Sequence, residues 1–351
     1  MDEMFSTKTM LGVIEASKSS NAAWLRDRYF SDVKTFDTTK IEFDIRGLDD
    51  RKILPFVNPL VGGQQVTRGG YTTEVYEAPE LSPFMVTSAE DLLARRPGEN
   101  AYSGRSPEER AGEQLGEDLR DLDAKITRTE EIMCADALFQ GKIDVKGKGY
   151  DDVISYWSHL ESQLQPKTTI GSKWDSVDAK AIAADLRVAR QTMMRQGGFT
   201  PRDLVCGTKV INAILDKLQD GKMLDLRRVD MGLIDPQHLP DGVTYWGYLK
   251  DSGLDIYSYD NWYTNAKGQA VSMVPENLAL LASPGAKTSM AYGCCALASP
   301  EDGLKFFSER RVPESYVSRR DPAGRIVQIK SRPLPLIQQI YGFRVLEAIA
   351  A

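Results

Sequence analysis

The longest regular pattern of apolar and polar positions covers residues 106–140. Apolar residues recur there at intervals of three, four or multiples of these, the period of a helix with one buried face. They are Leu115, Leu119, Leu122, Ile126, Met133 and Ala137. Ser106 can cap the first turn, Pro107 suits the first helical position, and Gly141 ends the pattern. The sequence therefore predicts one helix over 106–140, roughly 50 Å long at 1.5 Å per residue.

The other positions of this helix are mostly charged, and acids outnumber bases. The acids are Glu108, Glu109, Glu113, Glu117, Asp118, Asp121, Asp123, Glu130, Glu131 and Asp136, and the bases are Arg110, Arg120, Lys125 and Arg128. One interpretation is a solvated helix with one buried face, or a coiled-coil arm. Another is a long helix on which a sheet packs while its charged flanks meet neighbouring copies. Gly112 and Gly116 weaken the helix interior and favour a bent helix over a regular coiled coil.

Two segments before this helix contain too little apolar material to form a core. Residues 1–37 are polar apart from short helical patterns at 10–16 and 24–30, so they form either a frayed terminus or an arm that folds across a neighbour. Residues 57–96 are interrupted by glycine and proline around a β-prone run at 71–76. Because a two-stranded excursion is unstable alone, we expect it to lie on its own domain or on another subunit.

The remaining patterns contain both strands and helices, and the middle part of the chain is predicted to form an α+β domain of its own. The expected elements are a strand at 39–45, a hairpin at 142–157 turned at 147–149, a linker at 160–172, a helix capped by Asp175 or Ser176 and ending at Gly197, a strand at 203–206, a helix through 210–218, strands at 243–246, 254–257 and 278–281, a long hairpin at 304–332 turned at 321–324, and a strand at 343–346.

Composition narrows the class of protein. The chain has 351 residues, 42% hydrophobic and 27% charged, with a net charge of −6, which is ordinary for a soluble globular protein of about two structural units. With a pI near 5.3 and no Lys/Arg cluster, the chain lacks the cationic surface that nucleic-acid binding requires. No run approaches the roughly 18 apolar residues of a membrane helix. The acidic start Met1-Asp2-Glu3 is unlike a secretion signal, so we expect a cytosolic protein.

Candidate chemistry is sparse. His159 and His238 have no neighbours at metal-ligand spacing, so we predict no zinc or non-haem iron site. The sequence has no Gly-x-Ser-x-Gly elbow, and the segment at 285–288 lacks the first glycine of a phosphate loop, which indicates a turn. The cysteines lack metal or redox spacing and are predicted to be reduced, packed thiols. They are Cys134, Cys206, Cys294 and Cys295.

We therefore predict no catalytic residue, no cofactor and no metal, and expect that the chain is not an enzyme. Carboxylate pairs are plentiful, which leaves a glycosidase-type dyad open without favouring one. Composition and spacing alone describe a soluble α+β protein with a long helix and two projections that lack their own cores. This profile is typical of a structural protein.

Several local sequences, in this order, resemble a known family. They are WLRDRYF at 24–30, FDTTK at 36–40, NPLVGG at 58–63, VTRGG at 66–70, VPEN at 274–277, RVP at 311–313, DPA at 321–323 and PLPL at 333–336. Together with the order of arm, β excursion, long acidic helix, hairpin and α+β domain, they resemble the phage lambda-type major capsid protein family, whose shells use the Hong Kong 97 capsid fold. The resemblance covers nearly 300 residues.

The resemblance implies a domain plan and a function. Residues 1–37 would be the N-terminal arm, 57–96 the extended loop, and 166–303 the axial domain. The peripheral domain would combine 38–56, 97–165 and 304–351, with 106–140 as its spine helix. The chain would be the major capsid protein of a tailed phage, assembling into hexamers and pentamers of an icosahedral shell around packaged double-stranded DNA. The arm and the extended loop would lie on adjacent subunits.

The resemblance also implies partners. Copies of the chain would meet one another, and the contacts would involve Trp24, Arg28, Arg68, Gly69, Gly70, Glu117, Arg120, Arg128, Asp321 and Gly324. Portal and cementing proteins would be further partners. A scaffold would also be a separate protein, because the arm begins almost at Met1 and leaves no room for a long scaffolding segment. The shell would be part of the virion capsid and assemble in the host bacterial cytoplasm. It would enclose DNA without sequence-specific binding, since an acidic chain does not grip the genome, and it would not bind membranes.

Some shells of this fold join the extended loop to a neighbour through a lysine. No lysine occurs between Lys52 and Lys125, so we expect a non-covalent lattice. Two alternatives remain open at this stage. An encapsulin-like nanocompartment shell would contain cargo protein in place of DNA, and a soluble hydrolase using acidic residues would be an active monomer.

Overall fold

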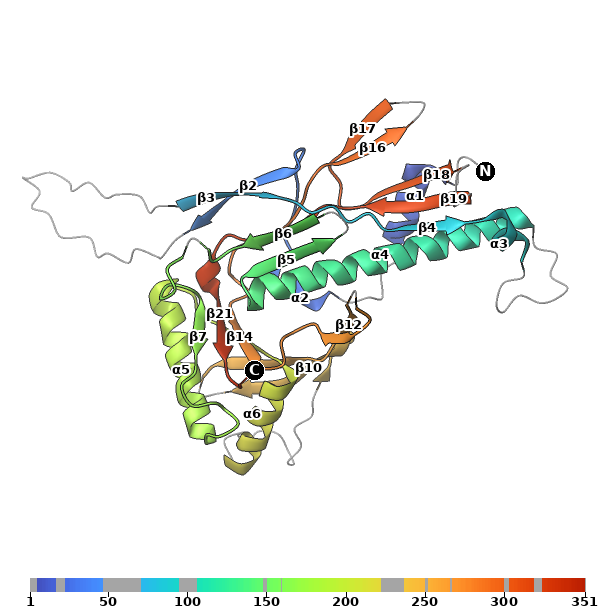
Figure 1. Cartoon of the computed structure of the whole chain (residues 1–351). Coiled ribbons are helices and arrows are strands. Elements are labelled where there is room, and N and C mark those ends of the chain that lie inside the picture. Colours follow the sequence, from blue (N-terminus) through green and yellow to red (C-terminus); the bar gives the residue numbers. More distant parts are fainter. Residues whose placement is uncertain are drawn as a thin grey trace, which may run out of the picture. The chain divides into compact units, whose positions relative to one another are not determined.

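The computed structural model describes residues 5–16, 23–46, 71–94, 106–147, 150–158, 160–221, 237–249, 252–265, 267–299, 303–318 and 324–350. Figure 1 shows the chain coloured along the sequence. The chain divides into two compact units. Unit 1 comprises residues 1–41, 76–133 and 290–335. Unit 2 comprises residues 42–75, 134–289 and 336–351.

The long helix predicted for 106–140 is confirmed as α4, which spans Pro107–Phe139. The Ser106 hydroxyl accepts a hydrogen bond from the Glu109 amide at 3.2 Å, and the Glu109 carboxylate accepts one from the Ser106 amide at 3.0 Å. This reciprocal capping box satisfies two amides that the first helical turn leaves unpaired. The helix ends just before Gly141, whose φ of 67° is the left-handed conformation that glycine adopts most easily.

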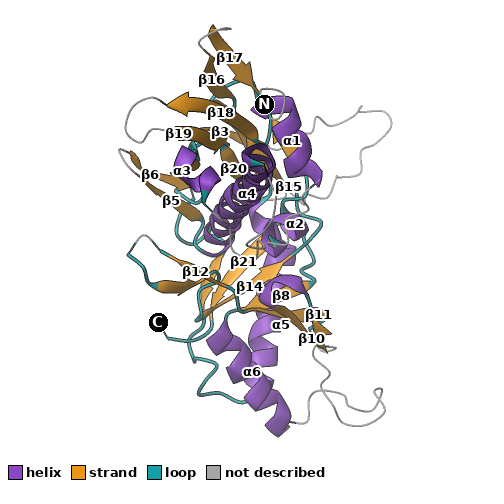
Figure 2. Cartoon of the chain, turned by 90° about the vertical axis from the view of Figure 1, so that its right-hand side faces the viewer, coloured by secondary structure: helices purple, strands orange, loops and turns teal. Residues whose placement is uncertain are grey.

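A hydrophobic core of unit 1 lies between the helices α4 and α1 and a strand, β19. Its members are Met10, Leu115, Leu119, Leu122, Ile126, Val327 and Ile329. Met10 belongs to α1 (Thr7–Ala16), and the last two belong to β19 (Gly324–Lys330). Figure 2 looks nearly along α4, with α1 on one side and β18 (Val312–Ser318) and β19 on another.

The arm therefore buries apolar side chains within its own unit. In addition to α1, the helix α2 (Trp24–Tyr29) buries Leu25 and Tyr29, and Phe30 after it is also buried. The expectation that the arm finds its burial on an adjacent subunit is wrong for these residues. The reason is that two acids of α4, which the sequence analysis assigned to solvated flanks, bind α2 directly, as described below.

Unit 1 contains two small sheets that involve β16 to β19. One has the order β18-β19-β4, where β4 is Phe84–Thr87 and leads into α3 (Ala89–Leu93). The other is a ribbon of β16 (Cys295–Ser299) and β17 (Gly303–Phe307). The single hairpin predicted over 304–332 is therefore wrong in extent, since β17 pairs with β16 while only β18 and β19 form the later hairpin. Alternation within a strand cannot reveal which neighbour it pairs with.

Unit 2 contains a mixed sheet of seven strands in the order β7-β21-β14-β8-β11-β10-β9. In that order the strands are Lys167–Thr169, Phe343–Glu347, Leu278–Ala282, Asp203–Cys206, Leu254–Tyr259, Val243–Leu249 and Gln237–His238. Every strand that the sequence predicted between 203 and 346 in this unit is present. The predicted linker at 160–172 is wrong at β7, which pairs in parallel with β21 at the sheet edge. Three residues are too few to show a strand period.

Helices α5 (Ala179–Gln196) and α6 (Thr208–Gly221) pack on one face of this sheet. Their inward positions share a core with alternate residues of the central strands, among them Ile182, Leu186, Met193, Ile211, Leu204, Ile256, Leu281 and Leu346. The N-cap of α5 is Asp178, so the predicted start at Asp175 or Ser176 is wrong by three or two residues. Trp174 lies fully buried before the helix, and its indole nitrogen donates to the Asp185 carboxylate at 3.0 Å, which fixes the approach to α5.

The remaining elements are short. One three-stranded sheet contains β1 (Val33–Thr35), β15 (Thr288–Tyr292) and β20 (Pro333–Ile337). The two-stranded ribbons are β2 (Lys40–Arg46) with β3 (Tyr71–Glu77), β5 (Lys142–Gly147) with β6 (Tyr150–Ser155), and β12 (Trp262–Thr264) with β13 (Ala270–Ser272). The 3-10 turns are Pro240–Gly242 and Ile340–Gly342. The predicted strand at 39–45 and the predicted hairpin after the long helix are confirmed as β2 and β5–β6.

Gly141 is required at the turn from α4 into β5. A Cβ atom there would overlap the ring of Trp157, and the backbone is left-handed. We expect Gly141→Ala to lower the free energy of unfolding by about 2–5 kcal/mol, because both the backbone strain and the overlap oppose folding. Gly147→Ala is the matched control, since a Cβ atom there meets nothing within 4 Å. Equal urea midpoints for the two variants would contradict this account.

Candidate functional site

The sequence analysis singled out Trp24 and Arg28 of the arm, and the structure brings them together on α2. The Arg28 guanidinium carbon lies 5.3 Å from the centroid of the Trp24 ring. The Trp24 ring also meets Tyr29 edge to face, with centroids 6.1 Å apart. Both Trp24 and Arg28 are half-buried. This stacked pair therefore presents a cationic and aromatic surface at the end of the arm.

Three further candidates, Glu117, Arg120 and Arg128, lie on the exposed side of α4. At about 100° per residue, these positions fall on one face of the helix. The acids Glu109, Glu113 and Glu117 come first along this face, Arg120 and Asp121 are adjacent in its middle, and the bases Lys125 and Arg128 come last. The helix thus presents an acidic patch and a basic patch in separate parts, with one base and one acid side by side between them. We call this surface the charged face of α4.

The other candidates are less informative. Arg68, Gly69, Gly70 and Asp321 lie outside the described residues. Gly324 begins β19, where an added Cβ atom would lie 2.7 Å from the Thr87 carbonyl oxygen. Packing against β4 within the same unit accounts for this glycine.

A buried carboxylate on α4 holds the start of α2. Ala23, at the N-cap of α2, supplies no side-chain cap. The Glu131 carboxylate takes that place, because it accepts hydrogen bonds from the backbone amides of Leu25 at 2.8 Å and Arg26 at 3.0 Å. A negative charge is favourable at the positive end of a helix dipole. Glu131 is fully buried, so it acts as a cap supplied by another part of the chain.

The adjacent carboxylate, Glu130, is the centre of a buried ionic cluster. It lies 2.6 Å from Arg311, 2.8 Å from Arg26 and 3.4 Å from Arg310, and it accepts a hydrogen bond from the Tyr292 hydroxyl at 3.1 Å. Its side chain is fully buried. One carboxylate therefore connects α4 to α2, to β15 and to the segment that precedes β18.

Arg311 links the cluster to two further turns of α4. Its Nε donates to Asp123 at 2.7 Å, and its terminal nitrogens donate to Thr127 at 3.3 Å and to Ser331 at 3.2 Å. The Arg311 side chain is only 4% exposed. Arg26 also pairs with Asp27 at 2.8 Å, so each arginine of the cluster has an acidic partner.

Electrostatics keeps these groups ionised. Burial by itself would raise the pKa of Glu130, but Arg311, followed by Arg310 and Arg26, outweighs burial and lowers it to about 2. For Arg311, burial acts to lower the pKa, and the neighbouring Glu130 reverses the effect and raises it. Burial raises the pKa of the Tyr292 phenol, and Glu130 raises it further, so Tyr292 stays a hydrogen-bond donor.

Sequence reasoning missed this cluster because it grouped Glu130 and Glu131 with the solvated flanks of the helix. A signal was present. Glu130 follows Ile126 by four residues and precedes Met133 by three, which places it on the apolar stripe. A charged residue on a buried stripe requires a partner of opposite charge. The partners Arg26 and Arg311 are each more than a hundred positions from Glu130 along the chain, so the local pattern does not identify them.

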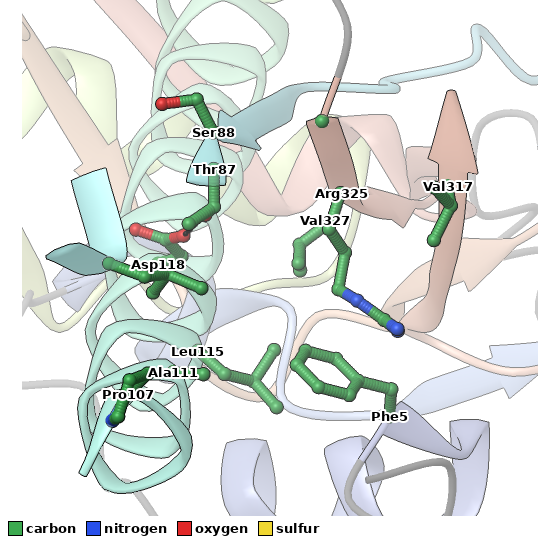
Figure 3. A pocket seen from close by; sticks show the side chains of 12 residues that line it. Phe5, Thr87, Ser88, Pro107, Ala111, Leu115, Asp118, Val317, Arg325 and Val327 are labelled. Carbon is green, nitrogen blue, oxygen red and sulfur yellow. Dashed lines mark hydrogen bonds between the residues drawn. The ribbon is translucent and has the colours of Figure 1, made fainter. Parts of the chain in front are cut away.

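A cavity of about 260 Å³ opens beside the first turns of α4, as Figure 3 shows. Its lining is mainly apolar: Phe5, Leu92, Pro107, Ala111, Leu115, Val317 and Val327, with Asp118 and Arg325 at its polar positions. The Arg325 guanidinium carbon lies 3.8 Å from the Phe5 ring centroid. Burial raises the pKa of Asp118, which accepts a hydrogen bond from Gln114 at 2.7 Å. The cavity is suited to an apolar side chain.

The histidines, the cysteines and the acidic side chains are the residues that could bind a metal ion or act in catalysis. Across the described ranges, no cluster of three or more His, Cys, Asp or Glu side chains could hold a metal ion. The four cysteines are free and buried, as predicted, and burial raises the pKa of Cys206 and Cys295, which lowers thiol reactivity. His238 bonds the Thr244 hydroxyl at 3.2 Å, and His159 lies outside the described residues. In the part of the chain that the structure describes, no helix has the length and hydropathy to cross a bilayer.

Comparison with known proteins gives consistent matches. A family model described as Phage major capsid protein E matches residues 6–344. The major capsid protein of Escherichia phage lambda is 24% identical over 344 residues, which cover 95% of this chain and 96% of that protein. The major capsid protein of Enterobacteria phage P21 is 21% identical over 356 residues, which cover 98% and 99%.

Solved structures agree in fold. A prophage capsid protein of Escherichia coli CFT073 superposes with a TM-score of 0.69 at 20% identity, covering 98% of this chain and 99% of that chain. A phage-related protein from Bordetella bronchiseptica RB50 gives a TM-score of 0.53 at 11% identity, covering 97% and 96%.

We expect Glu130→Gln to lower the free energy of unfolding at neutral pH by at least about 2 kcal/mol, because it leaves Arg311 and Arg26 buried with less opposing charge. Since the pKa of Glu130 is lowered from 4.5 to about 2 on folding, its contribution is present above 4.5 and disappears as the pH falls towards 2. The wild-type chain should lose about 2 kcal/mol of this contribution between about pH 6 and about pH 3, and the variant should not. Urea unfolding of the unassembled chain measures both quantities.

Asp121→Asn is the matched control, because Asp121 is exposed on the same helix and its replacement should change stability by less than about 0.5 kcal/mol. Asp136 titrates in the same range with the opposite sign: burial and nearby Asp144 raise its pKa to about 6, so its ionisation destabilises the fold as the pH rises. Comparing each variant with wild type at the same pH removes this contribution. Identical acid profiles for wild type and Glu130→Gln would exclude the proposed role of the cluster.

Proposed function

Because this chain belongs to the phage major capsid protein E family, we propose that its copies assemble into the hexamers and pentamers of an icosahedral shell that encloses packaged double-stranded DNA. As the major capsid protein of a tailed phage, it is a component of the virion capsid. The observation that carries the proposal is the family match over nearly the whole chain. A capsid protein is a structural protein, and we propose that it has no catalytic activity.

The α+β fold of the Hong Kong 97 type, expected from the sequence, is confirmed by the likeness to solved capsid proteins. Its division into an arm, an extended loop, a peripheral domain and an axial domain remains a proposal. Supporting the proposal, residues 107–133 of α4 belong to unit 1, and the seven-stranded sheet belongs to unit 2.

We propose that neighbouring copies meet along the charged face of α4 and at the stacked pair Trp24 and Arg28. Separated patches of opposite charge along one helix suit this role, because the acidic part in one copy can face the basic part in the next. Two-stranded ribbons such as β2–β3 also support assembly, since such ribbons are marginally stable alone and gain from a neighbour's surface. The remaining candidates, Arg68, Gly69, Gly70, Asp321 and Gly324, stay proposals.

The wider assembly follows the same proposal. Separate scaffold, portal and cementing proteins would act with this chain, and assembly would take place in the host bacterial cytoplasm. The net charge of −6 favours a shell that encloses DNA without binding its sequence.

Electron microscopy of the purified chain, alone and with the other head proteins of its phage, tests the proposed function. We expect closed shells that contain DNA when isolated from lysates, and we expect boiling denaturant to return them to single chains because the lattice is non-covalent. A chain that stays a monomer under every condition would refute the proposal. Cargo protein in place of DNA would favour a nanocompartment, and a ladder of covalent multimers would refute the non-covalent lattice.

Reversing charge on the charged face of α4 is expected to impair assembly. Arg120→Glu combined with Arg128→Glu reverses two of the three exposed bases of this face and leaves only Lys125, so the acidic part of a neighbour would meet mostly like charge. We expect fewer shells by light scattering and sedimentation, with the unfolding midpoint of the unassembled chain unchanged, because both residues are exposed.

The control is the conservative pair Arg120→Lys and Arg128→Lys, which keeps the charge and should keep assembly. Raising the salt concentration should weaken assembly of the wild-type chain and change the reversed variant less, since exposed charges are screened over about 10 Å at 0.1 M salt. Normal assembly of the reversed variant would show that this face does not contact a neighbour.

A further inference from the structure

The ribbon of β16 and β17 has two faces of different character. The strands pair antiparallel, with Ala296 opposite Phe306 and Ala298 opposite Leu304 on one face, and Cys295 opposite Phe307 on the other. Directly opposed residues share a face, and successive pairs alternate between faces. We call the face formed by Ala296, Ala298, Leu304 and Phe306 the outer face of the ribbon.

The other face is packed within the chain's own unit. Cys295 is fully buried and Leu297 nearly so, and both pack with Val312 while Phe307 covers them. The position of the ribbon is therefore fixed by its own core. Of the two faces, only the outer face of the ribbon is available for contact with another molecule.

The outer face is apolar throughout. Leu304 is 67% exposed and Phe306 is 70% exposed, and the two alanines beside them are exposed as well. An antiparallel sheet with one face on a core normally has a polar face towards water. Four apolar side chains in register on the solvent side indicate a surface that another surface covers.

The outer face also has a self-complementary shape. Both small residues, Ala296 and Ala298, lie on β16, and both large residues, Leu304 and Phe306, lie on β17. A second ribbon related by a twofold axis parallel to the strands places its β17 over the first ribbon's β16. Each large side chain then lies above an alanine of the other copy, and such an isologous contact needs only one surface patch.

We propose that the outer face of the β16–β17 ribbon packs against the same face of a second copy of this chain across a local twofold axis. The inference rests on the proposed shell function. Four side chains cover far less than the roughly 800 Å² per partner of a standard stable interface. The contact is therefore too small to hold a free dimer, and it forms where other contacts already hold the copies together, as they do in a shell.

A swap of large and small residues tests the proposal. Ala298→Leu places a large residue under Leu304 of the partner, and Leu304→Ala leaves a gap above Ala298. We expect each single variant to lower the temperature at which shells dissociate. The double variant carries the swapped pair, which restores one large and one small residue at each contact, and we expect it to recover most of the loss. Because these side chains are exposed in the unassembled chain, its unfolding midpoint should not change.

Cross-linking identifies the partner. In shells of the Leu304→Cys variant, a bifunctional thiol reagent that spans the roughly 10 Å between packed sheets should give a band at twice the chain mass. The natural cysteines are buried and do not compete. Lys305→Cys is the control, because residue 305 lies on the opposite face and should give no such band.

The outcomes separate this inference from the proposed function. If wild-type shells form but the swap recovers nothing and Leu304→Cys gives no dimer, the ribbon contact is wrong and the shell function stands. If Leu304→Cys instead links to a different protein, the ribbon serves that protein and the twofold contact is wrong. If no shells form at all, the proposed function itself fails.

Discussion

The structure of unit 1 depends on two adjacent carboxylates that have no contact with water. Glu130 pairs with three arginines, and Glu131 caps a helix that lacks a cap of its own. Moving a charged group from water into the interior costs several kcal/mol per ion, and this cost is offset only when partners of opposite charge are in place. The arm, the long helix and the segment before β18 must therefore fold together, because each supplies a charge that the others cannot leave unpaired.

This constraint gives the long helix two functions on opposite sides. Its buried side combines an apolar stripe with an ionic cluster and orders the arm within the same unit. Its exposed side carries separated acidic and basic patches, which suit contact with another copy. A helix whose interior contacts are strong can present charges outward without depending on them for folding, since exposed ion pairs contribute only about 0–1 kcal/mol.

Two solvent-exposed surfaces of the chain are apolar, although the exposed surface of a monomeric protein is normally polar. The outer face of the β16–β17 ribbon and the cavity beside α4 both expose hydrophobic groups to solvent. In an isolated protein such surfaces carry a risk of aggregation. In a chain whose copies build a closed shell, the same surfaces are available for defined contacts, and each can be small because a closed assembly contains many of them.

The sequence alone determined the features that local chemistry controls: α4 with its Ser106 cap, the strands of the seven-stranded sheet that it predicted, and the buried, free cysteines. These depend on residues within a few positions of one another. Only the tertiary structure decided that Glu130 and Glu131 are buried, that β17 pairs with β16, and that β7 forms a strand. The physical reason is distance along the chain, because Glu131 meets α2 across 106 positions and local periodicity holds no information about such partners.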